Sequence, residues 1–161
     1  MNTSEMIEIV RAAWSTVPAP PKDDMKLMDL GWGEDAALAF TGVAPMDVDV
    51  ESSGFAAATP LFDLPPRAAA AYLGTFLISL LKELKFQEKV GFFDDVVSRA
   101  HTLTCLTNQN FWNNVIRKHL SPECQRAVER VAHHLVASRD AFALDQEQVD
   151  TLHQLATPPN T

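Results

Sequence analysis

One stretch decides the fold of this chain, residues 64–84, which read LPPRAAAAYLGTFLISLLKEL. Two prolines precede four alanines; proline is tolerated at the first position of a helix, and alanine has the highest helix propensity. Large apolar residues then recur three and four positions apart, over a face wide enough to be buried on more than one side. They are Leu73, Phe76, Leu77, Leu80, Leu81 and Leu84. We therefore predict a buried helix at the centre of the core.

Helical spacing of apolar residues predicts further helices around this one. They cover residues 3–15, 34–40, 92–106, 111–120, 121–137 and 145–155, with a possible helical turn at 25–30. Ser121 and Asp145 are good N-caps, and Trp14 and Trp112 lie on apolar stripes that face the core. Only residues 46–51 alternate like a strand. The predicted fold is mainly α, a compact bundle of roughly six or seven helices with at most a small β-hairpin in the N-terminal half.

Length and composition predict one domain. The 161 residues suit a single core, which we divide into an acidic N-terminal part (1–63), a helical core (64–157) and a tail (158–161). No apolar run approaches the roughly 20 residues needed to span a bilayer, and the N-terminus does not read as a secretory signal. We expect a cytoplasmic protein. In that reducing compartment Cys105 and Cys124 would be free, buried thiols, although the sequence leaves a disulfide between them open.

The negative charge is concentrated in one segment. The chain carries a net charge of −8, and residues 22–63 contain nine acids but only two bases. Residues 64–161 contain ten of each. The acidic segment would repel a nucleic-acid backbone and attract a basic protein. Its predicted partner-binding residues are Trp32, Glu34, Asp35, Asp47, Asp49 and Glu51. Trp32 stands between two glycines and would serve as an exposed anchor, because tryptophan is enriched at the energetic centres of interfaces.

Motifs for catalysis, metal binding or phosphate binding are missing from the sequence, so we expect a non-enzymatic protein without a cofactor. His101 and Cys105 are the main alternative, because residues four apart on a helix could form a nucleophile and its base, or two zinc ligands. The simpler interpretation is a buried cysteine beside a half-exposed histidine. The adjacent His133 and His134 cannot chelate one ion together and are expected on the helix surface.

Three carboxylates alternate along the predicted strand, those of Asp47, Asp49 and Glu51. They could bind a hard cation, but the spacing lacks the glycine and the closing glutamate of a known calcium loop. A solvated edge strand is the expectation that we favour.

Two stretches carry a resemblance to a known family. Residues 64–77, LPPRAAAAYLGTFL, resemble the L-T-P-E-A-x-x-Y-Y-L-P-A-F-L core of a bacterial domain family of unknown function. Residues 120–128, LSPECQRAV, are similar to that family's L-S-x-E-Q-x-x-A-I helix start, and Phe40-Thr41-Gly42 resembles its upstream aromatic-Thr/Ser-Gly element. The chain departs from the pattern at Pro65, Arg67 and Gly74.

The resemblance implies no catalytic residues, and small acidic members resemble the immunity proteins encoded beside bacterial toxins. We therefore expect a non-enzymatic protein-binding module, an immunity or inhibitor protein that neutralises a basic bacterial toxin or nuclease. The alternative is a small helical enzyme or a ligand- or metal-binding bundle that uses His101 and Cys105, with His119 or His133 as a further group. A helix-turn-helix regulator is disfavoured, because no helix has a net basic face. The sequence leaves the oligomeric state open.

Overall fold

A computed structural model describes residues 1–25, 40–52, 55, 60–90 and 97–157 of the chain. Its main helices are α1 (Thr3–Trp14), α4 (Pro66–Val90), α5 (Val97–Leu106), α8 (Pro122–Ala137) and α9 (Gln146–Ala156). Between α5 and α8 lie α6 (Gln109–Phe111), the π-helical turn η4 (Trp112–Ile116) and α7 (Arg117–His119). Three short 3₁₀ turns are η1 (Lys22–Met25), η2 (Pro45–Asp47) and η3 (Pro60–Phe62). The prediction of a mainly helical bundle is confirmed.

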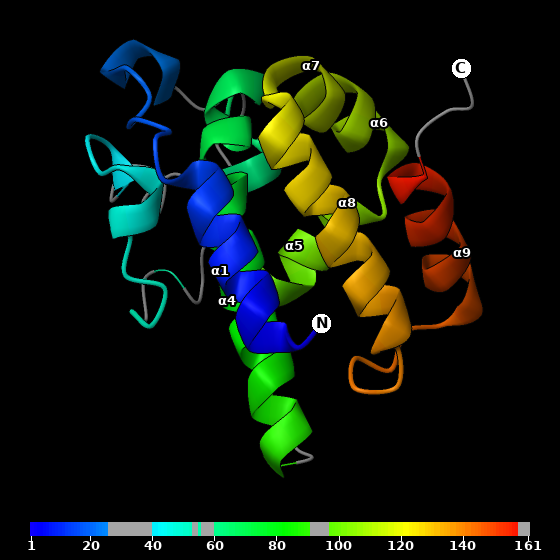
Figure 1. Ribbon diagram of the computed structural model, residues 1–161. Coiled ribbons are helices and arrows are strands. Elements are labelled where there is room, and N and C mark those ends of the chain that lie inside the picture. Colours follow the sequence, from blue (N-terminus) through cyan, green and yellow to red (C-terminus); the bar gives the residue numbers. More distant parts are fainter. Residues whose placement is uncertain (26–39, 53–54, 56–59, 91–96, 158–161) are drawn as a thin grey trace.

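The helices pack around α4 (Figure 1). Helix α1 packs against both α4 and α8, and α9 covers the other side of α8. Helix α5 and turn η4 also contact α4. Because α4 and α8 run opposite to α1, their first turns lie at the end of the bundle where α1 finishes. None of the described helices is long and apolar enough to cross a membrane.

Side-chain caps position the helix starts. The Asn2 side chain accepts the backbone N–H of Glu5, whose carboxylate in turn accepts the N–H of Asn2. Asp145 and Gln148 form the same reciprocal pair before α9, and Ser121 Oγ accepts the Cys124 N–H at the start of α8. Such caps satisfy backbone groups that have no partner within the helix. The predicted helix starts at residues 3, 121 and 145, the last two with Ser121 and Asp145 as N-caps, are therefore confirmed.

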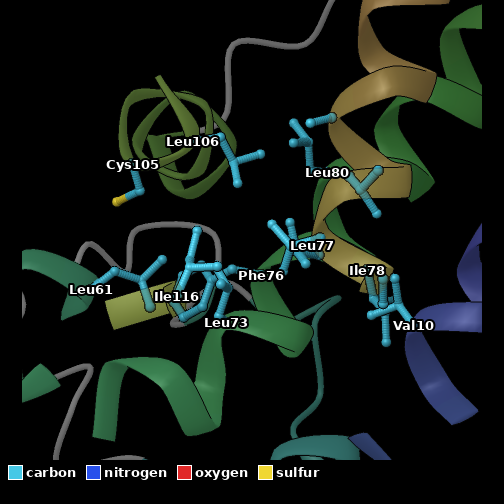
Figure 2. Packing of buried hydrophobic residues seen from close by; sticks show 14 of the residues in the cluster. Val10, Leu61, Leu73, Phe76, Leu77, Ile78, Leu80, Cys105, Leu106 and Ile116 are labelled. Atoms are coloured by element: carbon cyan, nitrogen blue, oxygen red, sulfur yellow. The ribbon is translucent and has the colours of Figure 1, made fainter. Parts of the chain in front are cut away.

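The predicted face of α4 forms the core. All six of its large apolar residues are at most 1% exposed, as are Trp14 and Trp112. Figure 2 shows side chains of α4, including Leu77 and Leu80, gathered with residues from other elements. Gly74 is required here, because a Cβ at this position would overlap the indole ring of Trp14. The core thus depends on close contact between α1 and α4 as well as on the leucines.

A buried ion pair links α4 to α5. Arg99 Nη1 lies 2.7 Å from Glu83 Oε2, and the Glu83 side chain is only 4% exposed. Gln87 donates a hydrogen bond to the other Glu83 oxygen at 3.3 Å. A carboxylate removed from water in this way requires such partners, because burial of an uncompensated charge is costly.

The described part of the chain contains no strand, so the possible β-hairpin of the N-terminal half is not seen among these residues. Residues 45–52 instead form turn η2 followed by a second turn, in which the Ser52 N–H donates to the Asp49 carbonyl. Pro45 lacks the N–H that a ladder requires, and the alternating run has no partner strand among the described residues.

The predicted helix at 111–120 is interrupted by η4, and α4 continues beyond Leu84 to Val90.

Candidate functional site

Residues 40–52, a described part of the acidic segment, are fastened to α4 by two side chains. The Tyr72 hydroxyl lies 2.8 Å from the carbonyl oxygens of both Phe40 and Val43, and its single hydrogen is donated to one of them or shared between the two. Thr75 Oγ1 donates to the Pro45 carbonyl at 2.7 Å. Because Tyr72 and Thr75 are themselves buried in the central helix, they hold the backbone of the segment in a defined position.

The alternating apolar and acidic residues at 46–51 face the core and the solvent respectively, although these residues do not form a strand. Met46, Val48 and Val50 are partly buried and pack against the core. The intervening Asp47, Asp49 and Glu51 are exposed, and we call these three side chains the acidic ridge. The sequence thus correctly predicted which of these side chains face solvent, even though the backbone consists of two turns joined at the extended Val48.

The ridge retains most of its negative charge. Glu51 pairs with Lys82 of α4 at 2.8 Å, but this pair is well exposed and contributes little to stability. One oxygen of Asp49 accepts the Glu51 backbone N–H at 3.0 Å, which stabilises the turn and leaves the carboxylate exposed. Within the described part of the chain, neither Asp47 nor Asp49 forms a salt bridge. Among the described residues, the ridge therefore presents two carboxylates without an ion pair, one of which accepts a backbone N–H, and a third in an exposed ion pair.

His101 and Cys105 do lie together, as their spacing predicted. Cys105 Sγ is 3.9 Å from His101 Nε2. The same nitrogen accepts the backbone N–H of Leu61 at 3.2 Å, and the ring of Phe62 packs edge-on against the imidazole. A nitrogen that accepts an N–H carries no proton of its own. The histidine is therefore neutral in this arrangement.

Burial opposes a reactive ion pair at this site. It lowers the pKa of His101 to about 4 and raises the pKa of the Cys105 thiol. An activated cysteine requires the opposite, a thiolate stabilised by a nearby positive charge. Both cysteines are free and buried, so the predicted free thiols are confirmed. In this geometry His101 accepts the Leu61 N–H and so links η3 to α5. The Cys105 thiol packs in the core.

The remaining histidines have separate environments. His133 is exposed, with its ring centroid 5.7 Å from that of His153. His134 is half-buried, and its Nε2 lies 3.0 Å from Thr3 Oγ1, which donates to Glu88 at 2.9 Å. The expectation of a surface residue therefore fits His133, whereas His134 joins helices α1, α4 and α8. Among the described residues, no three His, Cys, Asp or Glu side chains are grouped closely enough to hold a metal ion.

Three predicted contact residues, Trp32, Glu34 and Asp35, lie outside the described residues. So do most of the predicted helices at 25–30 and 34–40, and the beginning of the one at 92–106. The structure therefore places only the ridge half of the predicted partner-binding set.

A pocket of about 310 Å³ lies where α1 ends. Its walls are the proline-rich segment after α1, the first turns of α4, and the junction between α7 and α8. Sequence reasoning did not single out this site, because its residues are up to 110 positions apart, from Trp14 to Cys124. The nearest local feature of the sequence is the proline-rich run at 18–21, which cannot continue helix α1.

Comparisons of the chain with protein family models, with curated proteins and with solved structures found no match. The resemblance to the bacterial domain family therefore stays a prediction carried by residues 64–77 and 120–128.

Proposed function

We propose that this chain is a non-enzymatic protein-binding module that recognises a basic protein through its acidic ridge. The observation that carries the proposal is the arrangement of Asp47, Asp49 and Glu51 as exposed carboxylates on a backbone anchored to the central helix. A fixed array of like charges accelerates the approach of an oppositely charged partner and loses little conformational entropy on binding.

The concrete form of the proposal is an immunity or inhibitor protein of the bacterial cytoplasm that blocks a basic toxin or nuclease. The net charge of −8 and its concentration in the N-terminal part support an attraction to a basic partner and repulsion of nucleic acid. Trp32, Glu34 and Asp35 remain proposed contacts beside the ridge. The alternative of a His101–Cys105 enzyme is less well supported, since the buried pair favours the neutral forms of both groups.

The test compares two variants with equal changes in net charge. The ridge variant carries Asp47→Lys, Asp49→Lys and Glu51→Lys, whereas the control variant carries Asp140→Lys, Glu147→Lys and Asp150→Lys on exposed positions around α9. A partner isolated from the native host is measured by surface plasmon resonance at two salt concentrations. We expect the ridge variant to bind more slowly and with a flatter salt dependence, because rim charges act over roughly 8 Å at physiological salt.

The control variant should retain most of the association rate. Co-expression should also protect cells from the isolated partner if that partner is toxic. An acidic partner, or equal effects of the two variants, would contradict the proposed interface.

The double change His101→Ala and Cys105→Ser should leave binding intact if the fold is retained, whereas loss of activity in a folded double variant would favour the enzyme alternative.

A further inference from the structure

The pocket at the end of α1 combines an apolar interior with a basic mouth. Most of its lining is apolar and comes from Trp14, the segment from Val17 to Pro21, Ala70, Ala71 and Leu120. The polar lining residues are Arg67, His119, Ser121 and the thiol of Cys124. None of the described residues that line the pocket is acidic. This is a local exception in a chain whose net charge is −8.

Several groups make the mouth favourable for an anion. The pKa of His119 is lowered, first by partial burial and then by the positive charges of Lys118 and Arg67, so these three side chains share one electrostatic environment. The first turns of α4 and α8 contribute Arg67 and Ser121 to the lining. The N-terminal ends of helices carry partial positive charge, which favours a negative group nearby.

Backbone carbonyls that could oppose an anion are already hydrogen-bonded, and the acid Glu123, whose charge acts on Cys124, is exposed to solvent and does not line the pocket. The C-terminal end of α1 points to the same region, but the Ala13 carbonyl accepts the Cys124 thiol at 3.2 Å and the Ala12 carbonyl accepts the Ser15 hydroxyl at 2.8 Å. The Trp14 indole N–H donates to the Ala70 carbonyl at 3.4 Å, which leaves the ring as an apolar base of the pocket. The polar lining side chains Arg67, His119 and Ser121 are exposed or half-buried, so they lie on the solvent side of the pocket, which we call its mouth.

We propose that this pocket binds a small amphipathic carboxylate, with its apolar body against Trp14 and the proline-rich segment and its carboxylate at Arg67 and His119. The volume lies at the lower end of the range of ligand pockets. A water molecule, with its one non-hydrogen atom, takes up roughly 30 Å³ in the liquid. At about that volume for each non-hydrogen atom, the pocket holds about ten of them, the size of a medium-chain fatty acid. Charge decides between ligands of that size, because an ammonium would meet Arg67 and Lys118, and a neutral alcohol would leave the guanidinium without an ionic partner.

The test uses octanoate as the probe, with octylamine, octanol and acetate as matched ligands, and isothermal titration calorimetry as the measurement. We expect octanoate to bind with a dissociation constant below about 1 mM and the other three to bind at least about tenfold more weakly. Amide signals of Ala71 and Ser121 should shift in NMR spectra when octanoate is added. Arg67→Gln should weaken octanoate binding about tenfold, since a charge-assisted hydrogen bond is lost. Arg130→Gln, at an exposed position of α8 outside the pocket, is the control and should bind normally.

Two variants fill the pocket from different walls, Ala71→Leu on α4 and Ala19→Leu on the proline-rich segment. Each should abolish binding while the circular dichroism spectrum is retained; if one fails to fold, the other provides the result. If both fail, the exposed Arg67→Gln variant decides. The proposal is overturned if octanoate does not bind at about 10 mM, if octylamine or octanol binds as well, if Arg67→Gln has no effect, or if a folded filling variant binds normally.

Discussion

The hydrogen bond from the Leu61 N–H to His101 should make the protein sensitive to acid. In the folded state the accepting nitrogen must be unprotonated, and burial lowers the pKa of His101 to about 4. In the unfolded chain the pKa returns to its ordinary value of about 6.5. As the pH falls through 6.5, the unfolded state therefore takes up a proton before the folded state does. Stability from this group is complete above pH 6.5 and is lost progressively toward pH 4.

The magnitude follows from the difference between the two pKa values. A difference of about 2.5 pH units at 1.36 kcal/mol each corresponds to about 3 kcal/mol of unfolding free energy. This is a large fraction of the stability of a domain of this size. His119 and His134, whose pKa values are also lowered, change stability in the same direction, so the contribution of His101 has to be isolated by substitution.

Urea unfolding of the wild type and of His101→Gln at pH 7 and pH 4 would isolate the contribution of His101 to the unfolding free energy. The glutamine can still accept the Leu61 N–H but does not titrate, so the other histidines and the carboxylates cancel in the comparison. We expect the wild type to lose about 3 kcal/mol more than the variant between the two pH values. An NMR titration should give a His101 pKa near 4. A measured pKa near 6.5, or equal losses in both proteins, would refute the reasoning.

Two substitutions in α4 test the packing of the core. Leu77→Ala should lower the unfolding free energy by about 2–5 kcal/mol, because it leaves a cavity around a fully buried position; Phe86→Ala on the same helix, where the ring is 48% exposed, should cost much less. Gly74→Ala should destabilise by about 1–3 kcal/mol despite the higher helix propensity of alanine, because the new Cβ would overlap Trp14. Combining it with Trp14→Leu should make the cost less than additive. Urea unfolding measures both effects; an unchanged midpoint for Leu77→Ala, or strict additivity for the Gly74 pair, would contradict this packing.

Local sequence determined where the helices are and which faces they bury. The cap at Asn2, the proline at the start of α4 and the cap at Asp145 act within one turn of the residues that they stabilise. The spacing of the leucines on α4 likewise depends only on the pitch of a helix. The alternation at residues 46–51 predicted the exposed ridge, but it could not show that the backbone would form turns, because a strand also requires a partner.

Only the tertiary structure determined the burial and the charge state of the polar side chains on these helices. Local sequence does not distinguish Glu83 from an exposed acid, yet its side chain is buried, because Arg99 on another helix compensates its charge. The spacing of His101 and Cys105 fits a reactive pair and a structural one equally well. Only the Leu61 N–H, 40 residues away, shows that the imidazole is held neutral. The pocket beside Arg67 likewise exists only where α1, α4 and α8 meet. Such environments depend on partners distant in sequence, and local periodicity carries no information about them.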